Sequence, residues 1–245
     1  MKLADHFTRS GDFLFRWRGY LPLVMLPFFA LGLLDAGLPQ PVPAFTRGVQ
    51  VVAVAIALAG LAVRVVAIGT AAEGTSERST VNPRASRLRT TGLYSLMRHP
   101  LYAGNTVTAI GLAAFTTRWY LPVIVLLLGL LYHERIAARE EAFLEDRFGK
   151  AFREWADQVP AMLPLVTRYR RADVPFGWRR PLGSEFHGLM TIASVVLVLD
   201  LFRSWLATGR LVFDALWTGL FLAAAALFAG CTVLKKTTSV FEARG

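Results

Sequence analysis

Cysteine is almost missing from this chain. Cys231 is the one cysteine among 245 residues, and it lies in an apolar run near the end. A single thiol excludes a disulfide within the chain and a metal site built from several thiolates. The four histidines, His6, His99, His133 and His187, are too scattered for their spacing to indicate a metal site.

The common signatures of soluble enzymes are also missing. The sequence has no GxGxxG motif after a strand, no GxxxxGK[ST], no HExxH and no GxSxG. Charge is scarce, because only 18% of the residues are charged and 54% are hydrophobic. These features do not favour a soluble catalytic domain, and the high hydrophobic content makes the apolar runs the informative part of the sequence.

Apolar runs of membrane-spanning length recur along the chain, separated by polar loops. Hydrocarbon offers no water to backbone groups, so a spanning helix needs about 20 mostly apolar residues. We therefore predict an all-α, polytopic membrane protein with about six transmembrane helices. Arg118 alone separates the third span from the fourth, which predicts a tight helical hairpin. The predicted spans are Tyr20–Gly37, Phe45–Ala72, Leu101–Thr117, Trp119–Ala138, Phe186–Leu206 and Leu211–Leu234.

The basic residues are distributed unevenly between the two sides of these spans. Of 27 Lys and Arg, four lie in 1–19, five in 73–100, ten in 135–185 and three in the tail, whereas four lie on the other side and Arg64 lies within a span. This bias predicts an integral protein of the bacterial inner membrane with both termini in the cytoplasm. The net charge of +10 then reflects topology and attraction to anionic lipids, and not nucleic-acid binding.

The stretch "YSLMRHPLYAGN" opens the third predicted span. Pro100 suits the first turn of a helix, which places His99 at the cap and Arg98 just outside it. A helix start offers free amides to an anion, and an arginine adds a forked, charged donor. Gly104 permits close approach of a ligand or a helix. These twelve residues alone favour a simpler interpretation, an interfacial anchor.

Two adjacent carboxylates, Glu140 and Glu141, follow the membrane end of the fourth predicted span. Because the third and fourth spans form a hairpin, this acidic pair should lie beside the helix start at Pro100. A ligand with an anionic end and with hydroxyl or cationic groups would match that arrangement. The alternative is a solvated turn in which the carboxylates pair with Arg135 or Arg139.

Arg64 lies inside the second predicted span. A charge within a membrane helix is costly, so it usually has a partner or faces a polar cavity. We therefore expect Arg64 to have a pairing or functional role.

Residues 92–164 carry two motif elements, in order, around the predicted hairpin. The elements are "GLYSLMRHPLYAG" and "EEAFLEDRFGKAFREWADQVPAMLP". Together they resemble the isoprenylcysteine carboxyl methyltransferase family and its phospholipid N-methyltransferase relatives. The family's two tyrosine positions hold Phe152 and Trp155, which keep the aromatic bulk and lose two hydroxyls. The matching positions are Gly92, Tyr94, Arg98, His99, Pro100, Tyr102 and Gly104, then Glu140, Glu141, Leu144, Phe148, Gly149, Val159, Pro160 and Pro164.

The resemblance implies a methyltransferase that binds S-adenosylmethionine (SAM) at the cytoplasmic membrane boundary without a Rossmann domain. It implies that the SAM carboxylate meets the start of the third span and Arg98 or His99. It also implies that the acidic pair receives the ribose hydroxyls or the ammonium group. The expected catalytic residues are Arg98 and Arg64, either of which can orient an acidic acceptor; the sequence does not decide between them. The expected cofactor-binding residues are His99, Tyr102, Gly104, Tyr94, Glu140 and Glu141.

We expect residues 1–185 to form a four-helix methyltransferase core and residues 186–245 to form an additional C-terminal helix pair. The expected partners are a lipophilic acceptor and membrane lipids. Carboxyl O-methylation, N-methylation and S-methylation all stay open. Two other functions stay open: a membrane reductase of a lipid, whose NADPH phosphate the basic loop 78–98 can bind, and a non-catalytic membrane transport or assembly protein.

Overall fold

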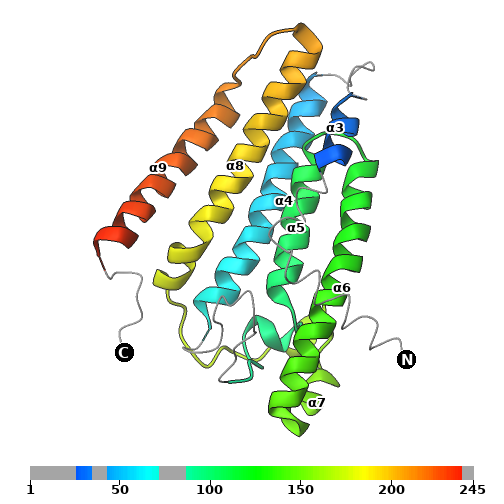
Figure 1. The fold of residues 1–245 in the computed structure, drawn as a ribbon, viewed down its shortest axis with the longest axis vertical. Helices are drawn as coiled ribbons and strands as arrows, with labels where there is room; N and C mark the ends of the chain where they lie inside the picture. Colours follow the sequence, from blue (N-terminus) through cyan, green and yellow to red (C-terminus); the bar gives the residue numbers. More distant parts are fainter. Residues whose placement is uncertain (1–25, 35–42, 72–86, 239–245) are drawn as a thin grey trace.

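The computed structural model describes residues 26–34, 43–71 and 87–238, which fold into helices joined by turns (Figure 1). Two short 3-10 turns, Leu93–Ser95 and Val166–Arg168, lie in the connections. The prediction of an all-α protein is confirmed. The helices are α3 (Leu26–Leu34), α4 (Pro43–Gly69), α5 (Pro100–Ala114), α6 (Tyr120–Phe148), α7 (Lys150–Ala156), α8 (Arg179–Thr208) and α9 (Ala215–Thr237).

Four helices in the described part of the chain are long and apolar enough to cross a membrane. They are α4 from Phe45, α6, α8 and α9, which correspond to the second, fourth, fifth and sixth predicted spans. The third predicted span is α5, whose 15 residues fall short of the usual spanning length. Of the first predicted span, Tyr20–Gly37, only α3 lies within the described residues. The polytopic membrane class is confirmed, and the number of six spans stays a prediction.

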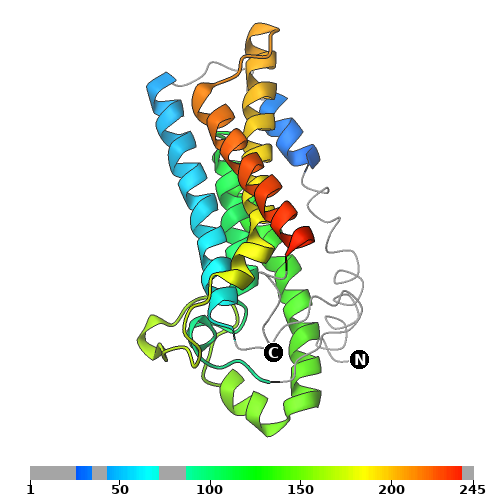
Figure 2. The ribbon, with the colours of Figure 1, turned by 90° about the vertical axis from the view of Figure 1, so that its left-hand side faces the viewer.

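Helix α4 lies between α5 and α8. It packs against α5 on one side and α8 on the other, while α6 packs on α5 and α9 packs on α8 (Figures 1 and 2). The starts of α5 and α8 and the ends of α4 and α6 lie at the same end of the bundle as α7, which we call the α7 end. The opposite end, where α4 and α9 begin, is called the far end.

Glycines allow α4 and α5 to approach each other closely. A Cβ atom on Gly60 would lie 2.5 Å from the carbonyl oxygen of Gly104 and 2.5 Å from the amide nitrogen of Thr108. A Cβ atom on Gly111 would lie 2.4 Å from the amide nitrogen of Ala57. Membrane helices often pack through such small residues. The hydrophobic effect does not drive helices together inside lipid, so close van der Waals contact between backbones stabilises the pair instead. The position of α5 is therefore set by its contact with α4.

Two backbone turns shape the hairpin and its extension. Thr117 adopts a left-handed conformation (φ 63°) between α5 and α6, next to Arg118 where the sequence predicts the hairpin. Helix α6 then runs for 29 residues, past the apolar part of the span. Gly149 ends it with φ 53°, a conformation that glycine adopts without steric cost, and α7 turns away (Figure 2). The sequence predicts that residues 135–164 leave the bilayer as a helix that lies along its surface and ends at Pro160. In the structure α6 and α7 divide this stretch, and α7 ends at Ala156.

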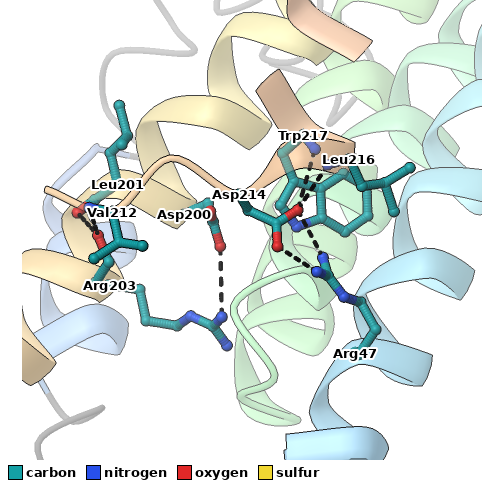
Figure 3. Close-up of polar contacts among 9 residues, drawn as sticks. Arg47, Asp200, Leu201, Arg203, Val212, Asp214, Leu216 and Trp217 are labelled. Atoms are coloured by element: carbon teal, nitrogen blue, oxygen red, sulfur yellow. Dashed lines mark hydrogen bonds and ion pairs between the residues drawn. The ribbon is translucent and has the colours of Figure 1, made fainter. Parts of the chain in front are cut away.

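An ion pair at the far end joins the start of α9 to α4 (Figure 3). Asp214 caps α9 by accepting bonds from the amides of Leu216 and Trp217. The same carboxylate forms a two-pronged ion pair with Arg47 of α4. Hydrogen bonding to Arg47 lowers the pKa of the Asp214 carboxyl below its ordinary value.

The predicted boundary between residues 185 and 186 falls inside α8, which begins at Arg179 and packs along α4. The division into a core and an added pair stays a prediction.

Candidate functional site

The hairpin brings the start of α5 beside the end of the apolar part of α6. His99, the residue before α5, is buried, and its Nε2 lies 2.7 Å from Glu141 Oε1. Nε of Arg98 lies 3.3 Å from the same carboxylate oxygen. The hydroxyl of Tyr102 donates to Glu140 Oε2 over 3.0 Å. The structure thus places four of the six predicted cofactor-binding residues, and Arg98, in one network.

The backbone at the start of α5 is more fully bonded than the sequence suggests. The amides of Arg98 and His99 donate to the carbonyl oxygens of Pro160 and Ala161, over 2.8 and 3.0 Å. The amide of Tyr102 donates to the carbonyl of His99. The expected row of bare amides is therefore wrong for these three positions. The segment after α7 folds back and caps the helix start, so anion binding there depends on side chains and on the helix dipole.

Three rings stack beneath this network. The ring of Tyr102 lies 5.5 Å from that of His99 and 5.2 Å from that of His133, with interplanar angles of 22° and 18°. His133 is buried on α6, and its Nδ1 lies 2.9 Å from the hydroxyl oxygen of Thr106. The sequence places His133 on the helix face of Glu140 through their spacing of seven, and it gives His133 no role. Its burial against α5 depends on the hairpin contact.

Among the described residues, Tyr94 forms its hydrogen bonds away from the two carboxylates of the network. Its phenol oxygen accepts a bond from Arg89 over 3.2 Å, and its carbonyl accepts one from the indole of Trp155 over 3.3 Å. Burial raises the pKa of the Tyr94 phenol, against the opposing effect of Arg89. Tyr94 therefore links the turn before α5 to α7, and the phenol stays neutral at physiological pH.

Arg64 is held by groups from two other helices. Its Nε and Nη2 donate to the two carboxylate oxygens of Glu185 on α8, over 2.7 and 2.8 Å. Its Nη1 donates to Asn105 Oδ1 over 2.7 Å. The aliphatic stem of Arg64 crosses Gly104, where an added Cβ would lie 2.8 Å from Cγ of the arginine. Gly104 thus admits a neighbouring helix, which is one of the two roles that the sequence allows.

Sequence reasoning missed Glu185 and Asn105. Glu185 immediately precedes the fifth predicted span, so its acidic charge at a span entrance is a signal, although nothing in the sequence pairs it with Arg64. Asn105 closes the quoted stretch "YSLMRHPLYAGN", and its polar side chain in an apolar helix is the corresponding signal.

Comparisons with known proteins show similarity over the part of the chain that carries this site. Residues 48–151 match the family model described as phospholipid methyltransferase. Cobalt-zinc-cadmium resistance protein CzcN of Cupriavidus metallidurans is 36% identical over 83 residues, which cover 34% of this chain and 38% of that protein. Nickel-cobalt-cadmium resistance protein NccN of Alcaligenes xylosoxydans xylosoxydans is 34% identical over 87 residues, which cover 36% of this chain and 40% of that protein.

Isoprenylcysteine methyltransferases are similar over a stretch of the same size. Protein-S-isoprenylcysteine O-methyltransferase of Schizosaccharomyces pombe is 31% identical over 80 residues, covering 32% of this chain and 34% of that protein. Each match thus spans less than half of the relative's length. No solved structure matches the chain. The family resemblance predicted from the two motif elements is confirmed.

Proposed function

We propose, from the match of residues 48–151 to the phospholipid methyltransferase family model, that the chain transfers a methyl group from SAM to a lipophilic acceptor. The observation that carries the proposal is the network of His99, Tyr102, Glu140 and Glu141, in which residues of both motif elements contact one another across the hairpin. Carboxyl O-, N- and S-methylation are all compatible with it.

The side chains of this network fit the polar groups of SAM. The guanidinium of Arg98 suits the carboxylate of SAM, because its forked donors match a carboxylate. The side chains of Glu140 and Glu141 are 36% and 23% exposed, so their oxygens can accept bonds from an ammonium group or ribose hydroxyls. The stacked rings of Tyr102 and His99 offer a flat wall. His99 orients Glu141 in this assignment, and Tyr102 orients Glu140.

When bound, SAM supplies an electrophilic methyl group on a sulfonium, whose departure leaves a neutral thioether. An in-line displacement of this kind depends on positioning and on the exclusion of water more than on a strong base. Arg98 and Arg64 are the proposed acceptor-orienting residues. Because the helices lie in a membrane, the acceptor reaches them laterally from the bilayer. We place the α7 end at the cytoplasmic face, as the basic residues predict.

Titration of the purified protein in detergent with SAM, and separately with NADPH, tests the proposal. Binding of SAM and not of NADPH is expected, and absence of SAM binding at high micromolar concentration would overturn the methyltransferase assignment. NADPH binding in its place would favour the reductase. Transfer of a labelled methyl group into a lipid extract then tests catalysis and narrows the acceptor.

Variants of the acidic pair test the site separately from the function. Glu140→Gln and Glu141→Gln should each weaken SAM binding about tenfold, because a hydrogen bond to a charged group contributes at least about 1.5 kcal/mol. Glu145→Gln is the matched control, since Glu145 lies on the same helix and pairs with Arg153 at the surface. SAM binding that is equally strong in all three variants would show that the site is misplaced even if the activity is right.

A further inference from the structure

Three polar side chains from three helices meet beside the candidate site. Arg64 of α4 bonds both carboxylate oxygens of Glu185 on α8 and the side-chain oxygen of Asn105 on α5. Arg64 orients the acceptor in the proposed function, whereas Asn105 and Glu185 have no role in it. We call this group the three-helix cluster.

The three residues lie at one depth. Arg64 is five residues before the end of α4, Asn105 is five residues after the start of α5, and Glu185 is six residues after the start of α8. At a rise of 1.5 Å per residue, these offsets correspond to about 8–9 Å from the α7 end. The cluster therefore lies one helical turn beyond Tyr102, away from the α7 end, with Arg64 and Asn105 inside predicted spans and Glu185 at the entrance to the fifth.

The cluster is not sealed inside the protein. Glu185 is buried at 5% exposure, but the Arg64 side chain is 22% exposed and Asn105 is exposed. Polar groups that face hydrocarbon are costly unless they are bonded or line a polar cavity. The exposed amide of Asn105 and the partly exposed guanidinium of Arg64 therefore indicate that a polar group of a ligand binds to them at this depth.

The free hydrogen-bonding capacity of the cluster consists of donors. A guanidinium has five N–H groups, and the bonds to Glu185 and Asn105 use three of them. Because Asn105 accepts through its oxygen, its NH2 group can point two further donors outward. No bond to these remaining N–H groups occurs among the described residues. Glu185 balances the charge of Arg64, so the donors belong to a cluster with no net charge.

We propose that the three-helix cluster is the subsite for the polar group of the lipophilic acceptor, and that this group is an uncharged oxygen such as a carbonyl or hydroxyl. Glu185 is a positioning residue of this subsite, because its carboxylate holds the Arg64 guanidinium in place. It also neutralises the positive charge of Arg64, which would otherwise favour an anionic ligand. The inference rests on the proposed function for the identity of the ligand as an acceptor. It also gives α8 a role, because Glu185 of α8 completes the subsite.

The test uses two lipid probes with the same acyl chain, neutral methyl palmitate and anionic palmitate, which differ in charge and by one methyl group. Native mass spectrometry of the whole chain of 245 residues in detergent measures the ratio of the affinities for the two probes. The wild type should favour the neutral ester. Glu185→Gln should shift the ratio at least about tenfold toward the anion, because Arg64 then carries an uncompensated charge. A purely structural role for Glu185 would lower the melting temperature without changing this preference.

Asn105→Leu provides a second arm that leaves the ion pair intact. It should weaken binding of the ester several-fold while palmitate changes less, and the melting temperature should stay near that of the wild type. The matched control is Thr191→Val, because Thr191 is an exposed polar residue of α8 whose hydroxyl bonds the carbonyl of His187 in its own helix. Ester binding that is equal in Asn105→Leu and Thr191→Val would overturn the subsite, even if Glu185→Gln fails to fold.

These measurements need no SAM, so they are independent of the proposed function. A protein that binds the ester through Asn105 but does not bind SAM would refute the methyltransferase and keep the subsite. A protein that binds SAM but shows no change in lipid preference in either variant would keep the methyltransferase and refute the subsite.

Discussion

Replacement of Gly60 by alanine should force α4 and α5 apart. The added Cβ would lie 2.5 Å from two backbone atoms of α5, whereas ordinary contact begins at 3.4 Å, so about 0.9 Å of overlap must be relieved. The atoms are the carbonyl oxygen of Gly104 and the amide nitrogen of Thr108, which cannot rotate away as a side chain would. The helices themselves must therefore move.

The cost of this movement can be estimated from other overpacked cores. Inserting a methyl group into a close-packed contact costs about 1–3 kcal/mol. For a chain of this length, such a loss lowers the melting temperature by roughly 2–12 °C. The same movement separates Arg64 on α4 from Asn105 on α5, so lipid-probe binding should weaken as well.

Gly48→Ala is the matched control on the same helix. A Cβ atom added at Gly48 would have no neighbouring atom within 4 Å, and alanine favours a helix over glycine by about 0.5–1 kcal/mol. Thermal unfolding in detergent, followed by tryptophan fluorescence, should show a lower melting temperature for Gly60→Ala and an equal or higher one for Gly48→Ala. Equal melting temperatures for the two variants would refute the tight backbone contact between α4 and α5.

Other perturbations act at the candidate site and at the far end. Tyr102→Phe should weaken SAM binding several-fold by releasing Glu140, as measured by calorimetry, and unchanged affinity would remove Tyr102 from the site. His99→Ala should weaken it further, because Glu141 loses its 2.7 Å partner; binding as strong as the wild type's would contradict the assignment of His99. Asp214→Asn should lower stability at pH 7 by about 1 kcal/mol or less, since the pair with Arg47 is partly exposed. Because folding lowers the pKa of Asp214 from 3.8, this contribution is present above that pH and is lost as the pH falls through the folded value. The gap in melting temperature between wild type and Asp214→Asn should therefore close in acid, and a gap that persists there would contradict the ion-pair account.

The sequence predicts the relation between the two motif elements well. Apolar length marks the helices, and the short break at Arg118 makes α5 and α6 neighbours, so Glu140 and Glu141 must approach His99. These inferences need only local patterns and chain connectivity. The same reasoning cannot place Pro160 and Ala161 on the start of α5. These residues lie in an irregular segment after α7, and such a segment has no periodic pattern that would predict which helix it contacts.

Partners that are distant in sequence are the other part that could not be predicted. Arg64 is expected to need a partner, but Glu185 lies 121 residues later, and the packing of α8 on α4 decides the pairing. The role of Gly104 likewise depends on which helix faces it. Long-range contacts between apolar helices carry no periodic signature that would identify one partner helix over another.

The separation between Arg64 and Glu185 also has a consequence for biosynthesis. At about 5–20 residues per second, the ribosome needs roughly 6–24 s to make the intervening 121 residues. During that interval α4 carries an arginine whose counter-ion has not been made, although Asn105 follows after 41 residues. Arg47 at the far end precedes its partner Asp214 by 167 residues, so it is also made long before its counter-ion. The last two helices therefore complete the charge balance of a helix that entered the membrane long before them, and a nascent chain halted before α8 would be left with both arginines uncompensated.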